Sequence, residues 1–404
     1  MVADARATMT ASTGMMRVSV VTTAYPTPEE PNRGAPIWAT LEKFQGKVDF
    51  EVNCSLARSP QWVRNIIRPR SYLAYPGSVD TEASPGMPAR ILDYFAVPGV
   101  TRWFNGRLLA RALERRVLQR RPDVILAYRI YPDGYAAVAV GKRLGIPAVI
   151  SSRGSDLKKL PPKGLVHHDT VEALRGAAAV LCVSEDLVRI ARSLGAANLH
   201  LVRNGVDRSI FYPVEQEEAR RSLRIPAADR LITFVGNLVP VKNVPLLLQA
   251  IRILKEAGEV WKAALIGKGH DEADLRALAG QLGIASQVSF LGRQPSREIA
   301  AWLNACDVFC LPSESEGLPN VVIEALACGR NVVGTRVGGI PELLTEESGI
   351  VVPQGDAQAL SAALSESGKR RWDRRSIERS YPWSWEDIAV RTIGICQDAV
   401  GKRG

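Results

Sequence analysis

Residues 312–329 read PSESEGLPNVVIEALACG. Pro319 suits the first turn of a helix, because that turn makes no use of the N–H that proline lacks. Gly329 suits the left-handed residue that commonly ends a helix. A short helix is therefore predicted between these two residues. Glu316 lies just before its start and Glu324 lies in its body, so two carboxylates flank one helix end.

The start of this helix is predicted to bind phosphate. Backbone amides from Leu318 to Asn320 have no helical partner, and the helix dipole adds positive charge there. Glu324 lies among apolar residues, where an unpaired carboxylate is costly, so it needs donors such as the hydroxyls of a ribose. The alternative is that Glu324 pairs with a neighbouring Arg and that Glu316 is a solvated loop residue. Together, the carboxylates and the amides favour a site for a nucleotide sugar.

The segment continues into VVGTRVGGIPEL at residues 332–343. Together with residues 312–329 it resembles the Glu-x7-Glu region of the retaining glycosyltransferases of family 4. The resemblance implies that Glu316 contacts the transferred sugar and that Glu324 binds the ribose of the nucleotide. The backbone contacts that it implies for the sugar and the pyrophosphate come from Gly317, Leu318, Pro319 and Asn320.

Short β-branched runs alternate with helical patterns along the chain, which predicts parallel sheets flanked by helices. Strands are expected at 18–22, 50–54, 124–128, 148–151, 180–183 and 199–202, and then at 231–235, 263–266, 288–291, 308–311, 332–334 and 349–352. The predicted fold class is α/β. Two Rossmann-like, doubly wound domains should face each other across a cleft, as in the GT-B glycosyltransferases that the sequence resembles.

Asn-Gly and a proline at 203–213 end the first series of strands and mark the predicted hinge. The expected units are a disordered leader at 1–16, an acceptor domain at 17–205, a nucleotide-sugar domain at 206–380 and a final segment at 381–404. The resemblance implies that this last segment is a helix that crosses back onto the first domain. Residues 56–99 are rich in Pro, Gly and Arg, and we expect an excursion over the first domain.

A turn after the first strand of the second domain should carry a cation. Residues 234–243 read FVGNLVPVKN, which places Gly236, Asn237 and Lys242 at the cleft. Relatives usually have Arg at the position of Asn237, and that Arg commonly contacts the pyrophosphate together with the Lys. One positive charge is therefore missing from this chain. The alternative for Lys242 is a solvated turn.

Arg153 follows a first-domain strand, in SSRGSD, where relatives more often have His. Because Arg stays protonated, it cannot act as a base, and we expect it to stabilise charge on the leaving phosphate. A salt bridge from Arg153 to Asp156 is the alternative. Asp156 and Asp133 are weaker predictions for the acceptor side, and Asp133 is equally suited to cap a helix.

Two further residues match places where the family meets its donor. Gly34 ends a proline-rich loop after the first strand, and glycine there allows the backbone to approach closely. Arg293 lies where relatives place the nucleotide base against the backbone. These two roles are implied by the resemblance.

The net charge of +10 is unevenly distributed. Residues 1–205 hold 28 Lys and Arg against 17 Asp and Glu, whereas the rest holds 24 against 25. The first half should therefore face an anionic partner, and an acidic phospholipid or a lipid-linked phosphate acceptor fits better than nucleic acid, for which no binding signature occurs. The basic segment 103–121 suits a membrane surface or a helix that covers a sheet.

Several other chemistries are disfavoured. The six cysteines are scattered among apolar segments, so we expect buried free thiols and no zinc site. The sequence contains no P-loop and no Asp-x-Asp pair, so no obligatory metal and no other cofactor is expected. Glu316 and Glu324 would lie about 12 Å apart along a helix, too far for the carboxylate pair of a glycoside hydrolase.

The sequence thus predicts a retaining glycosyltransferase. It should move a sugar from a nucleotide diphosphate sugar to a hydroxyl of a glycan or lipid-linked acceptor, and the resemblance is closest to teichuronic acid-type enzymes of bacterial polysaccharide synthesis. No apolar span or signal peptide is seen, so we expect a cytoplasmic protein at the inner face of the membrane. A sugar-nucleotide epimerase and a non-catalytic binding subunit are the alternatives. The sugar, the nucleotide, the acceptor and the oligomeric state are not set by these patterns.

Overall fold

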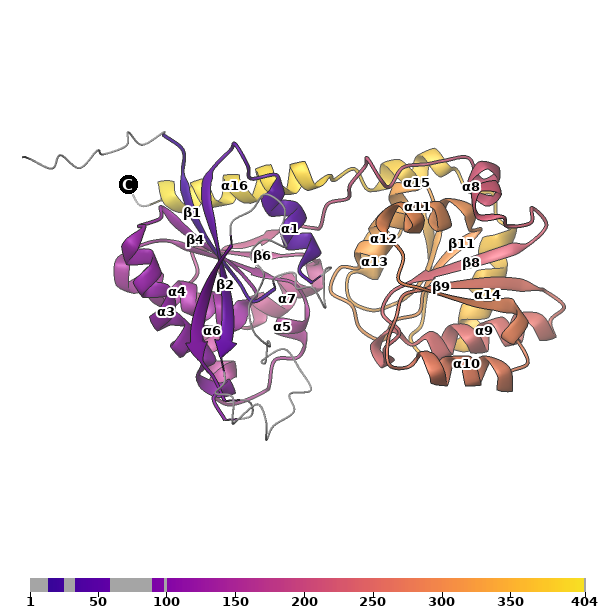
Figure 1. Cartoon of the computed structure of the whole chain (residues 1–404), viewed down its shortest axis with the longest axis horizontal. Coiled ribbons are helices and arrows are strands. Elements are labelled where there is room, and N and C mark those ends of the chain that lie inside the picture. Colours follow the sequence, from indigo (N-terminus) through magenta and orange to yellow (C-terminus); the bar gives the residue numbers. More distant parts are fainter. Residues whose placement is uncertain (1–13, 25–32, 59–88, 98–99, 403–404) are drawn as a thin grey trace, which may run out of the picture.

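Two parallel sheets, each at the centre of its own lobe, form the framework of the chain (Figure 1). The structure is a computed structural model, and it describes residues 14–24, 33–58, 89–97 and 100–402. The first sheet has the order β3-β2-β1-β4-β5-β6-β7 and the second the order β10-β9-β8-β11-β12-β13. Every pairing within the two sheets is parallel. The predicted pair of Rossmann-like α/β domains is confirmed.

The first sheet consists of β1 (Arg17–Thr22), β2 (Asp49–Arg58), β3 (Ala89–Phe95), β4 (Val124–Tyr128), β5 (Ala148–Ser152), β6 (Ala179–Cys182) and β7 (Leu199–Leu201). The second consists of β8 (Arg230–Val235), β9 (Trp261–Ile266), β10 (Val288–Gly292), β11 (Val308–Leu311), β12 (Val332–Thr335) and β13 (Gly349–Val352). Each strand expected from the sequence is present.

Strand β3 corrects the expectation for residues 56–99. It pairs with β2 at the edge of the first sheet, so residues 89–95 belong to the sheet and not to an excursion over it. β2 also continues to Arg58. The remainder of that segment, 59–88, lies outside the described residues, as does most of the leader expected at 1–16.

The helical elements of the first lobe are α1 (Ala35–Glu42), η1 (Arg102–Phe104), α3 (Asn105–Gln119), η2 (Ile130–Gly134), α4 (Tyr135–Leu144), α5 (Ser155–Lys158), α6 (Leu165–Gly176) and α7 (Glu185–Ser193). Those of the second lobe are α8 (Gln216–Leu223), η3 (Pro240–Lys242), α9 (Val244–Glu256), α10 (Glu272–Gln281), η4 (Ala285–Gln287), α11 (Ser296–Ala305), α12 (Asn320–Ala327), α13 (Ile340–Leu343), α14 (Ala357–Lys369) and α15 (Arg374–Ser380). In each lobe the helices cover both faces of the sheet (Figure 1).

The last helix, α16 (Trp385–Gly401), returns to the first lobe, where it lies beside α1 (Figure 1). Its apolar side chains Ile388, Ile393 and Cys396 pack into one core with side chains of α1 and of the first sheet. Ser384 and Asp387 form a capping box that fixes where the helix begins. The predicted crossing back is confirmed.

Two passages of the chain join the lobes and lie against each other. Val206, in the outgoing passage, bridges to Ser384 in the returning one, and its amide donates to Trp383 O at 3.1 Å. A Cβ on Gly205 would lie 2.4 Å from the amide nitrogen of Trp385, so only glycine allows this contact. Tyr381 Oη donates to the carbonyl of Asn204. The hinge is therefore two passages of chain joined by an isolated β-bridge and by the hydroxyl of Tyr381.

Helix α3 carries most of the basic segment that was expected to cover a sheet or a membrane. Its apolar residues Leu109, Leu113 and Val117 are buried in the core of the first lobe. Arg107 pairs with Asp169, and Arg116 and Arg120, near the other end of the helix, pair with Glu51 and Asp49 of β2. The helix therefore covers the sheet. None of the helices in the described part of the chain is both long and apolar enough to cross a bilayer.

Candidate active site

The centre of the second sheet is the place where a ligand is expected. Its strand order reverses between β8 and β11, and parallel sheets bind ligands beyond the carboxyl ends of the strands at such a point. The turn from β8 into η3 and the loop from β11 to α12 meet there, because the Glu314 amide donates to Val241 O at 2.8 Å. These two loops carry the predicted Lys242 and Glu316.

Lys242 and Glu316 form an ion pair, with Nζ and Oε1 2.6 Å apart. Ser313 Oγ donates to the same carboxylate oxygen at 2.7 Å. The two charged side chains are only 20% and 10% exposed, so Lys242 is not a solvated turn residue. The second oxygen of Glu316, Oε2, has no partner among the described residues. The pair therefore orients one free carboxylate oxygen and one cation at the mouth of the site.

The start of α12 differs from the prediction in one respect. Pro319 precedes the helix as its N-cap and has no N–H, so it cannot contribute an amide. The amides that donate to no described residue are those of Leu318, Asn320 and Val321. The helix ends as predicted at Gly329, whose φ of 67° is left-handed. Three free amides at a helix start suit phosphate oxygens.

Glu324 is half-buried in the body of α12, and its carboxylate has no hydrogen bond or ion pair within the described residues. The neighbouring Arg that was its alternative partner does not pair with it. Burial without a compensating donor raises the pKa of Glu324 from its ordinary value of 4.5 to about 7. The side chain therefore offers an acceptor that hydroxyl groups of a ligand could satisfy.

The turn after β8 has one cation fewer than the family pattern. Asn237 is exposed and its side chain bonds to no described residue, so nothing in this turn replaces the missing Arg. Gly236 is held by its amide, which donates to Ile266 O at 2.9 Å. Arg293 follows β10 and is exposed without a described partner. Lys268, which the sequence did not single out, lies beside Gly292 at the end of the neighbouring strand β9.

Arg153 connects the first lobe to the start of α12 through the hinge. Its Nη2 donates to Asn204 Oδ1 at 2.8 Å, so the expected alternative, a salt bridge to Asp156, is not formed. Asn204 Nδ2 in turn donates to Asn320 Oδ1 at 2.6 Å and to Leu318 O at 3.3 Å. Burial lowers the pKa of Arg153. The structure thus brings this cation to the same helix end as Glu316.

The two acids predicted for the acceptor side are engaged in their own lobe. Asp156 accepts hydrogen bonds from Ser152 Oγ and from three backbone amides at 3.0 to 3.2 Å. Asp133 is fully buried and accepts from Thr23 and from Ser55 Oγ. Asp133 lies inside η2 and caps no helix, which corrects the alternative given for it. Burial raises its pKa.

Gly34 begins α1 with a φ of 71°. A Cβ there would lie 2.4 Å from the carbonyl oxygen of Ala24, so the close approach that requires glycine is within the loop itself. Residues 25–32 of that loop lie outside the described residues.

The two lobes touch at the loop that holds Glu316. A Cβ on Gly154 would lie 2.9 Å from Gly317 Cα, so the backbones of the two lobes meet there. Lys158, from α5 of the first lobe, donates to the carbonyl oxygen of Glu316 at 2.7 Å. Local sequence patterns carry no signal for Lys158, because this contact joins residues 158 positions apart.

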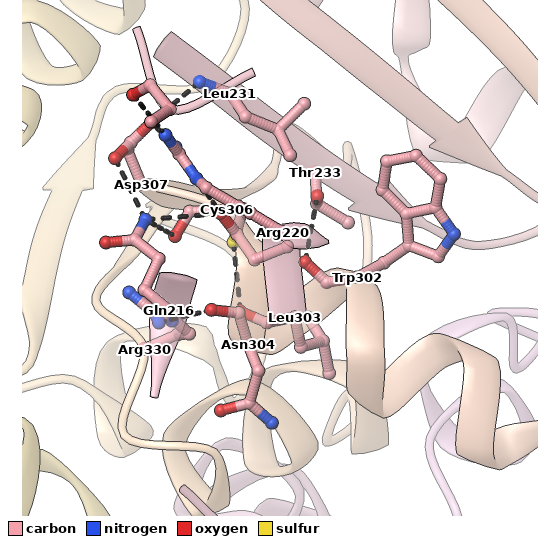
Figure 2. A network of polar contacts seen from close by, with 12 residues as sticks. Gln216, Arg220, Leu231, Thr233, Trp302, Leu303, Asn304, Cys306, Asp307 and Arg330 are labelled. Atoms are coloured by element: carbon pink, nitrogen blue, oxygen red, sulfur yellow. Dashed lines mark hydrogen bonds and ion pairs between the residues drawn. The ribbon is translucent and has the colours of Figure 1, made fainter. Parts of the chain in front are cut away.

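A second polar cluster lies at the opposite end of the second sheet, where β8 begins (Figure 2). Asp307 accepts from Arg220 Nη2 at 2.8 Å and from the Leu231 amide at 2.7 Å. Gln216 and Arg220 also donate to carbonyl oxygens at the end of α11. The charges of Arg220 and Asp307 are thus paired with each other, and this pair holds α8 to the sheet. The six cysteines are buried and unpaired, as expected, and no cluster of metal-binding side chains occurs in the described ranges.

Comparison with known proteins identifies the family. Residues 215–379 match the model of the group 1 glycosyl transferases, and residues 72–210 match that of glycosyltransferase family 4. TuaC of Bacillus subtilis, described as a teichuronic acid biosynthesis glycosyltransferase, is 31% identical over 358 residues, which are 87% of this chain and 88% of TuaC. This chain belongs to the family 4 glycosyltransferases.

Other relatives of this glycosyltransferase agree in family or in fold. WcaL of Escherichia coli, described as a colanic acid biosynthesis glycosyltransferase, is 37% identical over 170 residues, which are 40% of each chain. The structure of Anabaena HepE in complex with UDP-glucose has a TM-score of 0.65 at 17% identity and covers 96% of this chain and 99% of its own. The HepE likeness concerns the fold alone, and it confirms the GT-B arrangement of two lobes.

Replacing Glu324 by Gln should raise the stability of the ligand-free protein at pH 8 and change it much less at pH 5. The unfolded chain loses the Glu324 proton near pH 4.5, whereas the folded chain keeps it to about pH 7. Between these values the folded state binds more protons, so stability falls as the pH rises, by up to about 3 kcal/mol. Urea unfolding at the two pH values measures the difference.

Glu346→Gln is the matched control, because Glu346 is exposed and bonds to no described residue. A Glu324→Gln variant that is less stable than wild type at pH 8 would contradict the expectation. It would mean that the ionised carboxylate has a stabilising partner in the ligand-free protein.

Proposed function

We propose that this glycosyltransferase moves a sugar from a nucleotide diphosphate sugar to a hydroxyl of a glycan or lipid-linked acceptor and retains the anomeric configuration. The observation that carries the proposal is the convergence of Lys242, Glu316 and the free amides of α12 at one point, with an unpartnered Glu324 on the same helix. HepE, which shares the fold, was crystallised with UDP-glucose. The names of TuaC and WcaL support a role in polysaccharides of the bacterial envelope.

Each group of the donor meets a suitable partner in this arrangement. The pyrophosphate accepts hydrogen bonds from the α12 amides and lies near Lys242, while Arg153 approaches from the first lobe. The ribose hydroxyls donate to Glu324. Hydroxyls of the sugar donate to the free oxygen of Glu316. Because two cations and a helix start face the pyrophosphate, we also propose that the reaction has no obligatory metal and no other cofactor.

The transfer needs no protein nucleophile. The bond from the anomeric carbon to the phosphate oxygen breaks, and the bond from the acceptor oxygen forms on the same face of the sugar. The departing phosphate oxygen takes the proton of the acceptor hydroxyl. Lys242 and Arg153 stabilise the negative charge that develops on the pyrophosphate, so positioning and electrostatics supply the rate enhancement. Glu316 is bound by Lys242 and Ser313, which suits it to hold the sugar.

A thermal-shift screen with nucleoside diphosphates and their sugars, run with and without EDTA, tests the donor. A ligand at 100 times its Kd stabilises the protein by about 2.7 kcal/mol, so one nucleotide class should raise the Tm clearly, and EDTA should not abolish the shift. Glu324→Ala should lose the shift, and the Glu346→Ala control should keep it.

A cooperative melt without a shift for any nucleotide would contradict the proposed donor and favour a non-catalytic binding subunit. Conversion of the bound nucleotide sugar to an epimer without an acceptor would identify an epimerase instead. A shift that EDTA abolishes would mean that a metal joins the pyrophosphate.

We further propose that the first lobe works at the cytoplasmic surface of a membrane. Phe95, Val100, Trp103 and Phe104 are exposed where β3 ends and α3 begins. Arg102 is exposed beside them and forms no ion pair within the described residues. Aromatic side chains next to a cation suit the headgroup region of an anionic bilayer, where a lipid-linked acceptor would be found.

Flotation with liposomes that contain anionic phospholipid tests this surface. The double variant Trp103→Ser and Phe104→Ser should bind several-fold less than wild type. Leu118→Ser is the control, since Leu118 is exposed near the other end of α3. Equal flotation of all three proteins, or no flotation of wild type, would contradict the membrane role.

A further inference from the structure

The N-terminus of α7, in the first lobe, is capped by a side chain of the second lobe. Glu342 of α13 accepts hydrogen bonds from the Glu185 amide at 2.8 Å and from the Asp186 amide at 3.1 Å. The next amide, of Leu187, is capped within the lobe by Ser184 Oγ at 3.3 Å. Two of the first three amides of α7 therefore have a partner only while the lobes are together.

Three cations lie around this contact, and one of them, Arg189 of α7, pairs with Asp186 at 3.1 Å. Asp186 lies in the first turn of α7 close to Glu342, and Lys158 pairs with it at 2.7 Å. Arg203, in the hinge, lies 3.6 Å from the Glu342 carboxylate. The side chain of Glu342 is 16% exposed. A carboxylate at a helix start is favoured both by the amides and by the helix dipole.

The segment that carries Glu342 also packs on the loop from β11 to α12, residues 312–319, which holds Glu316 and is called the donor loop below. The Gly339 amide donates to Gly317 O at 2.8 Å. A Cβ on Gly338 would lie 2.1 Å from Glu316 O, and one on Gly339 would lie 2.8 Å from Gly317 O and 3.3 Å from Ser184 Cβ. The two glycines therefore let this segment lie between the donor loop and the start of α7. An opening of the lobes that takes this segment off α7 would therefore also separate the donor loop from the first lobe.

We propose that Glu342 is a positioning residue that closes the cleft by capping α7 across it. Closure brings Lys158 to the carbonyl oxygen of Glu316 and Gly154 against Gly317. Opening exposes two amides and one carboxylate to water, which hydrates them well. The contact between Glu342 and α7 is therefore weak enough to break and re-form in each catalytic cycle. The contact itself does not depend on the proposed donor, whereas its effect on turnover rests on the proposed function.

Hydrogen exchange of the ligand-free protein tests the contact without any substrate. In Glu342→Ala the amides of Glu185 and Asp186 should exchange faster by about tenfold or more, the ratio expected when a hydrogen bond to a charged group is lost. Leu187 should change less, because Ser184 still caps it. The control Glu346→Ala removes an exposed glutamate four residues away and should leave all three amides unchanged.

A second variant changes the first-lobe side of the same contact. Glu185→Pro deletes one of the two donors at the first helical position, where proline is tolerated, and Ser184 before it already has the extended backbone that proline requires. Spin labels on the two lobes report the distance between them. A protein that carries both substitutions should show no larger change in this distance than Glu342→Ala alone. Both variants should shift the distance distribution toward open forms and leave the Tm nearly unchanged.

Measurements of kcat and of nucleotide Kd distinguish a positioning role of Glu342 from a merely structural one. With the nucleotide sugar found in the screen, Glu342→Ala should lower kcat several-fold. The Kd for the free nucleotide should change much less, because most of its proposed partners, Glu324, Lys242 and the α12 amides, belong to the second lobe. Glu342→Gln, which keeps one acceptor oxygen, should restore part of kcat. Wild-type exchange at Glu185 and Asp186 that is as fast as in Glu342→Ala would overturn the proposal. Failure of the donor screen would leave that exchange result intact, so the two proposals fail separately.

Discussion

The position of Glu316 between the lobes is the constraint on which the rest of the site depends. Its carboxylate is fixed within the second lobe by Lys242 and Ser313, and its backbone carbonyl receives Lys158 from the first lobe. Neither lobe alone provides all three donors. Two parallel sheets that point their carboxyl ends at each other are what allow them to converge on one residue.

The site also contains polar groups without partners, which lowers the stability of the ligand-free protein and which a purely structural role would not explain. Glu324 stays half-buried without a partner, although burial alone raises its pKa to about 7. The amides at the start of α12 have no acceptor, while Asp307, at the other end of the same sheet, is paired with Arg220 and with the Leu231 amide (Figure 2). A half-buried carboxylate and free helix-start amides that lie together without partners indicate a place kept for a ligand.

The sequence predicted what local patterns determine. β-branched runs gave the strands, and Pro319 and Gly329 bounded α12, because turn and cap chemistry depends on a few adjacent residues. Edge strand β3 was missed, since the Pro- and Gly-rich composition around it resembles a loop. Lys158, Asn204 and Glu342 were missed because they act across the lobes, and spacing in the sequence carries no information on such contacts. Asp133 and Asp156 were singled out by motif, yet the structure uses them to hold their own lobe together.

The stereochemistry of the product tests the central claim most directly, because it reports how the cleft places the acceptor relative to the leaving pyrophosphate. Proton NMR of the first product formed from an α-linked nucleotide sugar distinguishes the two outcomes by its anomeric signal. Transfer on the face of the departing phosphate, with no protein nucleophile, predicts an α-linked product. A β-linked product would mean that the acceptor attacks from the opposite face, and it would contradict the roles assigned to Glu316, Lys242 and Arg153.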